Sequence, residues 1–112
     1  RLLGYFLGGG FYEGFPDDGV IWSEITAISG RNEAVRERLS RMWADWLAEI
    51  DDLLAAAYPA CEASVRGAVA YGLVCIVEES YVLRIQGMTG KQEIARQAAG
   101  MLLAQLQPPI ER

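Results

Sequence analysis

The chain has 112 residues, of which 52% are hydrophobic, and its ten Lys and Arg residues stand against fifteen Asp and Glu residues, a net charge of −5. This length allows one domain with a real core and is too short for two. The excess of acidic residues argues against a segment that binds a phosphate backbone, because nucleic-acid binders usually carry a basic patch. So high an apolar fraction in a small chain predicts an extensive subunit interface or an apolar cavity.

The sequence offers no membrane span, since its longest uncharged runs, 2–12 and 67–77, have 11 residues each and a transmembrane helix needs about 20. On one helix, Cys61 and Cys75 would lie about 21 Å apart, too far for a disulfide. We therefore expect reduced thiols in a cytoplasmic protein. The chain begins RLLGYF, without an initiator Met, and looks like a chain that has been cut into.

The apolar pattern predicts helices almost throughout, so the expected fold class is all-α, an antiparallel bundle of about five helices in a single domain, 1–112. A first helix is expected over 1–13, perturbed by the glycines at 8–10. Pro16 and the aspartates after it break the chain and open a helix over 18–29. Asn32 is expected to cap a long helix over 33–57, which Pro59 closes.

The next helix is expected from about residue 60 to 86, ending at Gly87. The residues 89–92, TGKQ, have the form of a capping box and predict a last helix to about 107. Both helices leave little of their circumference polar, which predicts burial on more sides than one small chain offers. We therefore expect a homodimer joined by these two helices as an intersubunit four-helix bundle. The expected interface residues are Leu83, Ile94, Ala98, Met101 and Leu102.

Two adjacent carboxylates, Glu78 and Glu79, interrupt the apolar run 71–85. An unpartnered buried carboxylate is costly, so each needs solvent, a partner or a ligand. On a helical wheel Glu78 shares the azimuth of Tyr71, whereas Glu79 lies about 100° away among small residues. Glu78 is the better candidate for a ligand contact, and Glu79 is expected to serve structure near a close-packed face. The alternative for each is an exit to solvent or an arginine partner across the dimer.

Catalytic chemistry is poorly represented, so we expect no enzymatic activity, no cofactor and no metal. The chain has no histidine, the commonest general base and metal ligand, and its two cysteines lack the spacing of a zinc site. Binding is better represented, because three tryptophans and five tyrosines suit a pocket for an aromatic or cationic ligand. Each of these aromatic residues can equally be an ordinary core residue.

The order of elements resembles the C-terminal domain of TetR-family transcriptional regulators, in the BetI-like branch. The stretch VIWSEITAISGRNEAVRERLSRMWADWLAEIDDLL carries the resemblance first, with an aromatic-acidic helix, a short break and a long arginine-bearing helix. In GAVAYGLVCIVEESYVLRIQG, Glu78 occupies the acidic position of the family's penultimate helix, and residues 91–106 resemble the final helix.

The resemblance, which covers 1–107, implies a homodimeric regulatory domain that binds a small apolar, aromatic or cationic effector and couples its binding to DNA release. The expected ligand-binding residues are Trp22, Thr26, Met42, Trp46, Tyr71, Cys75 and Glu78. The family's N-terminal helix-turn-helix unit is missing from this sequence, so DNA binding is expected only of a longer parent protein. The rival interpretation is a self-contained helical dimerisation or protein-interaction module without a ligand.

Overall fold

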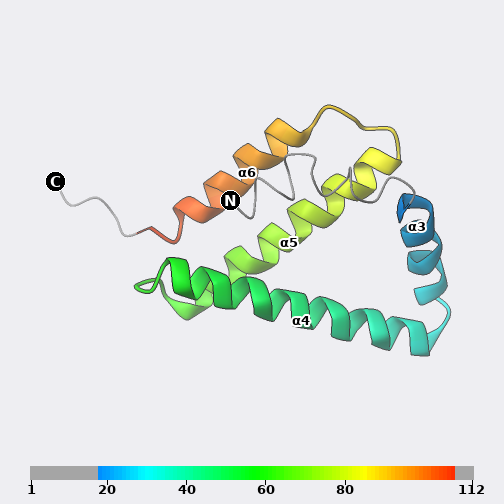
Figure 1. Cartoon of the computed structure of the whole chain (residues 1–112), viewed down its shortest axis with the longest axis horizontal. Coiled ribbons are helices and arrows are strands. Elements are labelled where there is room, and N and C mark those ends of the chain that lie inside the picture. Colours follow the sequence, from blue (N-terminus) through cyan, green and yellow to red (C-terminus); the bar gives the residue numbers. More distant parts are fainter. Residues whose placement is uncertain (1–17, 108–112) are drawn as a thin grey trace.

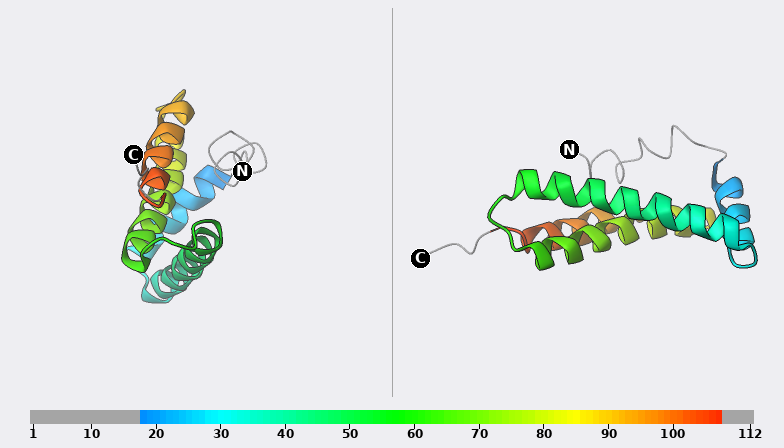
Figure 2. Two further views of the ribbon diagram at one scale, coloured as in Figure 1. Left: turned by 90° about the vertical axis from the view of Figure 1, so that its left-hand side faces the viewer. Right: turned by 90° about the horizontal axis from the view of Figure 1, so that it is seen from below.

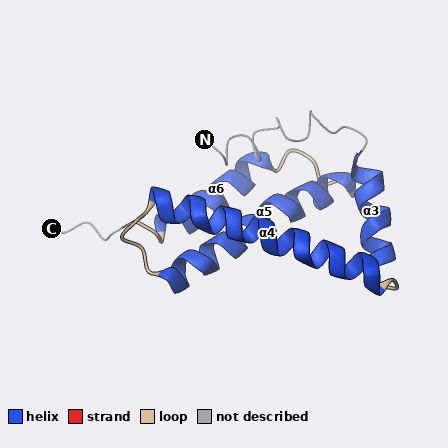
Figure 3. Ribbon diagram, turned by 60° about the horizontal axis from the view of Figure 1, so that its bottom comes forward, coloured by secondary structure: helices blue, strands red, loops and turns tan. Residues whose placement is uncertain are grey.

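The computed structural model describes residues 18–107, with side chains from residue 23 onward. All regular secondary structure in this range is helical, which confirms the predicted all-α class (Figure 3). The helix predicted over 1–13 lies outside the described residues. The helices are α3 (Asp18–Ser29), α4 (Glu33–Ala57), α5 (Ala63–Ile85) and α6 (Gln92–Ala104).

The boundaries of α3 and α4 coincide with the predicted ones. Asn32 caps α4 as expected, because its side-chain oxygen accepts a hydrogen bond from the backbone N–H of Val35 at 3.2 Å. At the other end of α4, the backbone N–H of Tyr58 donates to the carbonyl oxygen of Leu54 at 2.8 Å, and Pro59 follows. This short-range chemistry fixes α4 at both ends.

The start of α5 falls later than predicted, at Ala63, because residues 58–61 form a turn in which the N–H of Cys61 donates to the carbonyl of Tyr58 at 3.1 Å. Its end is the predicted one. Gly87 adopts the left-handed conformation, φ 96°, and the N–H of Met88 donates to the carbonyl of Leu83 at 2.9 Å. This pattern is the Schellman motif, which favours glycine after the last helical residue.

The capping box predicted for the last helix is wrong. Lys91 occupies the N-cap of α6 and no side chain donates or accepts a capping hydrogen bond there. Gly90 turns the chain with φ 73° just before the N-cap, so Thr89 stands too early to reach the first helical N–H groups. The helix also ends at Ala104, before the predicted 107, where tight i to i+3 bonds replace α-helical ones.

α5 is the central helix, because it packs against α6, α4 and α3 (Figure 1). α6 runs back along α5, and α4 lies to one side of this pair (Figure 2). α4 and α5 are close together near the turn at residues 58–62 and diverge from there. α3 lies across the wide end, between the start of α4 and the end of α5 (Figure 1).

The core lies in the narrow part of this wedge. From α4 only Ile50 and Leu54 are buried, and no residue between 33 and 49 is. The other residues of this core are Val69, Ala70, Leu73, Val74 and Val77 from α5, with Ala99 and Leu106 from the C-terminal segment. Tyr81, also buried, lies further along α5 outside this cluster. Among the described residues, the neighbouring helices leave Tyr71 on α5 exposed, so burial of the 60–86 helix on most sides stays a prediction that depends on a partner subunit.

Two specific contacts hold the narrow part together. The Arg66 guanidinium on α5 donates to the Asp51 carboxylate on α4 at 2.9 Å. Gly72 on α5 allows close approach of α6, since a Cβ atom there would lie 2.7 Å from Cδ1 of Leu102. Within residues 18–107 no helix has the length and apolar character needed to cross a bilayer.

Candidate ligand-binding site

A hollow of about 330 Å³ lies between α3, α4 and α5, in the wide part of the wedge. This volume falls in the usual range of small-molecule sites, about 300–1,000 Å³. Three helices contribute to its wall, so a ligand that fills the hollow would contact all three. Its lining residues are Thr26 and Ser29 from α3, Arg36, Leu39, Ser40 and Trp43 from α4, and Glu78 from α5.

The α4 wall follows from helical spacing. Arg36, Leu39, Ser40 and Trp43 recur at intervals of three and four residues, which places them on one face of the helix. Further along α4, Ile50 and Leu54 follow at similar helical spacing and lie in the core. Because α4 has diverged from α5 at its N-terminal half, Leu39 and Trp43 are only half-buried. Both residues line the hollow, and Trp43 also packs against the core cluster.

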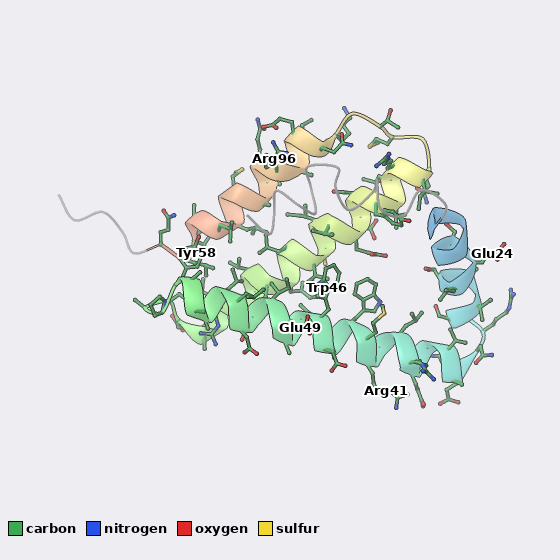
Figure 4. The ribbon with its side chains drawn as sticks, viewed as in Figure 1. Glu24, Arg41, Trp46, Glu49, Tyr58 and Arg96 are labelled. Atoms are coloured by element: carbon green, nitrogen blue, oxygen red, sulfur yellow. The ribbon has the colours of Figure 1, made fainter. Side chains whose placement is uncertain are left out.

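Trp43 is the largest apolar group in this wall, and a second indole supports it. The ring centroids of Trp43 and Trp46 lie 5.4 Å apart, with the rings tilted by 35°. Figure 4 shows Trp46 reaching from α4 toward α5, whereas Arg41 points away from it. Trp46 also packs against the core cluster. The Trp43 ring is therefore held in place from the side that faces the core.

The polar part of the wall contains two opposite charges, Arg36 and Glu78. Neither residue belongs to an ion pair within the described part of the chain, where Arg66–Asp51 and Arg96–Glu93 are the pairs formed. The hydroxyl of Ser29 donates to the carbonyl oxygen of Thr26 at 2.6 Å, so its own oxygen can still accept a hydrogen bond. The hollow thus offers a cation, a carboxylate and hydroxyl groups beside an indole.

Glu78 is half-buried, and the loss of hydration raises its pKa, with a further rise from the charge of Glu79. Glu79 itself is exposed. Its expected structural role near a close-packed face stays a prediction, because α6 packs at Gly72 on the same side of α5 while Glu79 itself reaches solvent. The two glutamates do occupy different surroundings, as their separation on the helical wheel predicted.

The structure brings two of the seven predicted ligand-binding residues, Thr26 and Glu78, to the hollow. Met42 and Trp46 lie on α4 outside its lining. Tyr71 is 62% exposed on α5, and Cys75, half-buried one turn later, raises the pKa of the Tyr71 phenol. The backbone of the seventh, Trp22, belongs to α3, and its side chain lies outside the described part of the structure.

Sequence reasoning missed five lining residues, namely Ser29, Arg36, Leu39, Ser40 and Trp43. One signal could have found the α4 members. The short break at residues 30–32 forces α3 to fold back beside the first half of α4, so the apolar face of that half had to be the wall of any site shared with α3. No group of three or more metal-ligating side chains occurs within the described residues.

A second surface matters for assembly. On α6, Ile94 and Met101 are 58% and 72% exposed, and Ala98 between them is half-buried. Leu102, also half-buried, packs at Gly72 on α5, where Cys75 follows one turn later. We call this surface the α5–α6 face. Its members are Tyr71, Cys75, Ile94, Ala98, Met101 and Leu102.

No family model, no curated protein and no solved structure matches this chain in comparisons of its sequence and fold. The resemblance to TetR-family domains therefore rests on the sequence stretches that suggested it. Function has to be argued from the hollow and from the α5–α6 face.

Proposed function

We propose that this chain is the effector-binding and dimerisation domain of a TetR-like transcriptional repressor of the BetI-like type. The observation that carries the proposal is the hollow, which has small-molecule size and is shared by three helices. A molecule bound there contacts α3, α4 and α5 together, so its affinity depends on how these helices are placed. Such a ligand stabilises the helix arrangement that it binds most tightly.

In the proposed mechanism, that preference is passed to a DNA-binding unit in a longer parent protein. α3 closes the wide end of the wedge, and the residues before it would lead to the DNA-reading heads. A change in the angle between α3 and α4 would alter the spacing of two such heads in a dimer, and helix-turn-helix dimers need a fixed half-site spacing. The coupling requires that the effector bind the two arrangements with different affinity.

Tryptophan fluorescence tests the binding part of the proposal, because Trp43 lines the hollow. A panel of apolar, aromatic and cationic compounds is titrated into the wild-type chain and into the Trp43→Phe variant. We expect at least one compound to give a saturable change in emission that is largely lost in the variant. A panel in which no compound gives saturable binding contradicts the proposal.

The dimerisation part rests on the α5–α6 face. Ile94, Ala98 and Met101 are spaced by four and three residues, so they form one stripe along α6. Such a stripe beside the exposed Tyr71 suits packing against the same pair of helices from a second copy. The predicted interface residue Leu83, 37% exposed near the end of α5, would extend it.

Sedimentation equilibrium tests this part. Wild-type protein is expected to be a dimer, and Ile94→Lys or Met101→Lys to be a monomer, because a lysine ammonium cannot be buried there without a partner. Met88→Lys is the control, since Met88 is also exposed, at 50%, but lies in the loop between α5 and α6. A wild-type monomer at high protein concentration contradicts the homodimer.

The uncovered α5–α6 face also favours the second candidate, a helical interaction module without a ligand. That module needs the face and has no use for the hollow. A chain that dimerises normally but binds no compound of the panel would fit the module and not the repressor domain.

A further inference from the structure

We infer that the hollow binds a small dipolar molecule, one that carries both a carboxylate and a protonated amine on a compact apolar body. This inference rests on the proposed function and names the chemical class of its effector. It also changes the sequence-based expectation of an apolar, aromatic or cationic effector, because that expectation did not include Arg36.

The first step is the charge of the wall. Arg36 comes from α4 and Glu78 from α5, so the two charges lie on different helices that face the same space. They form no ion pair with each other and none with another described residue. A purely cationic ligand would satisfy Glu78 and meet the Arg36 guanidinium, and a purely anionic one would do the reverse. A ligand with both charges compensates both groups.

The second step is the match of chemical groups. A guanidinium is a planar donor that suits a carboxylate, with which it can form two parallel hydrogen bonds. A carboxylate such as Glu78 only accepts hydrogen bonds when it is ionised, so its natural partner is an ammonium group. Burial weakens the hydration of Glu78, which makes a hydrogen-bonded cation more valuable there than at an exposed site.

The third step concerns the uncharged residues that line the hollow. Trp43 and Leu39 offer apolar surface in the same hollow, and the hydroxyls of Thr26, Ser29 and Ser40 add small polar groups. The apolar body of the ligand would lie against the Trp43 ring, which Trp46 holds in position. Amino acids and their close analogues have this combination of groups and are small enough for a hollow of about 330 Å³.

The test uses matched compounds that differ only in charge. Alanine, leucine and phenylalanine each supply a zwitterion, their amides supply the cation alone, and their N-acetyl derivatives supply the anion alone. Binding is measured by the tryptophan emission of the intact chain, excited where phenylalanine does not absorb, with Trp43→Phe to identify the contribution of Trp43. We expect the best zwitterion to bind at least about tenfold more tightly than either of its single-charge analogues, since each loses one charge-assisted hydrogen bond.

Two variants test which residue binds the carboxylate of the ligand and which binds its ammonium group. Arg36→Gln is expected to reduce the affinity for the zwitterion to that for its amide, and Glu78→Gln to that for its N-acetyl derivative. Arg38→Gln and Glu49→Gln are the matched controls, because both residues are exposed and neither lines the hollow. Helical circular dichroism shows whether each variant is folded.

The outcomes separate this inference from the proposed function. If a single-charge analogue binds as tightly as its zwitterion, or if only compounds of the first panel bind, the dipolar class is overturned and the site itself stands. If no compound of either set binds, both fail. If the control variants weaken binding as much as Arg36→Gln and Glu78→Gln, the assignment of the two ends is wrong.

Discussion

The Trp43 and Trp46 rings lie 5.4 Å apart on one face of α4, and this contact joins the wall of the hollow to the core of the wedge. Trp43 borders the hollow, and Trp46 reaches toward α5 (Figure 4). The site therefore lies where α4 passes from close packing in the core to the less buried packing of its N-terminal half. Its shape depends on where α4 and α5 begin to diverge.

The two indoles should be coupled in stability. Aromatic pairs at this distance contribute about 0.5–1.5 kcal/mol beyond the area they bury, so a double-mutant cycle of Trp43→Ala and Trp46→Ala should show an interaction of that size. Urea unfolding of the four proteins, at one protein concentration, measures it. If the two single effects add to within about 0.3 kcal/mol, the rings are neighbours without a stabilising contact.

Two adjacent leucines on α4 should contribute very different amounts to the free energy of unfolding. Leu54 is 8% exposed in the core, and Leu53 is 53% exposed. Leu54→Ala should lower the free energy of unfolding by about 2–5 kcal/mol, because it removes buried methyl groups and leaves a cavity. Leu53→Ala should change it by about 0.5 kcal/mol or less. Equal losses in the urea unfolding of both variants would mean that a partner covers Leu53.

Substitutions at two glycines of α5 should change the stability of the chain in opposite directions. A Cβ atom at Gly72 would lie 2.7 Å from Cδ1 of Leu102, so Gly72→Val should displace the Leu102 side chain from its place against α5 and destabilise the chain by about 1–3 kcal/mol. Gly67 has nothing within 4 Å of such an atom, so Gly67→Ala should stabilise the helix by about 0.5–1 kcal/mol. Thermal unfolding compares the two. A Gly72→Val variant as stable as the wild type would show that the Leu102 side chain moves aside without loss of packing.

Glu78 should make the chain less stable as pH rises. Its pKa is raised in the folded state by burial and by Glu79, so the native state holds the proton more tightly than the unfolded state does. The stability gained from protonated Glu78 is fully present below its unfolded pKa of about 4.3 and is lost as pH rises through the folded pKa. Glu78→Gln should therefore be more stable than the wild type at pH 7, and this difference should shrink toward pH 4.

Glu49→Gln is the control for this pH series, because Glu49 is an exposed glutamate on α4 (Figure 4). Its difference from the wild type should stay nearly constant over the same range in urea unfolding. A Glu78→Gln difference that does not vary with pH would show that the Glu78 carboxyl is as well hydrated in the folded chain as in the unfolded one.

Much of the fold could be predicted because its signals are local. Asn32 as a cap and Gly87 as a stop are read from single residues and their neighbours, and both are confirmed. The late start of α5 depends on a turn at residues 58–61, and the failed capping box depends on the φ angle of Gly90. Neither is visible from the apolar pattern alone.

The site could be predicted only in part, for a physical reason. The wheel separated Glu78 from Glu79 because azimuth follows from the sequence, and Glu78 is the one of the two that lines the hollow. Whether Tyr71, on the same azimuth, also reaches the site depends on where along α5 the hollow lies. The divergence of α4 from α5 decides this, and it depends on tertiary packing. Arg36 and Trp43 were missed for the same reason.

The most direct test of the account is the response of the indole N–H signals in a ¹H–¹⁵N NMR spectrum, assigned with Trp43→Phe and Trp46→Phe, during titration with the compounds described above. The account predicts that the Trp43 signal shifts and saturates with a compound that binds, with a smaller shift at Trp46. Saturable binding that leaves the Trp43 signal unmoved, or no binding by any compound, would contradict it.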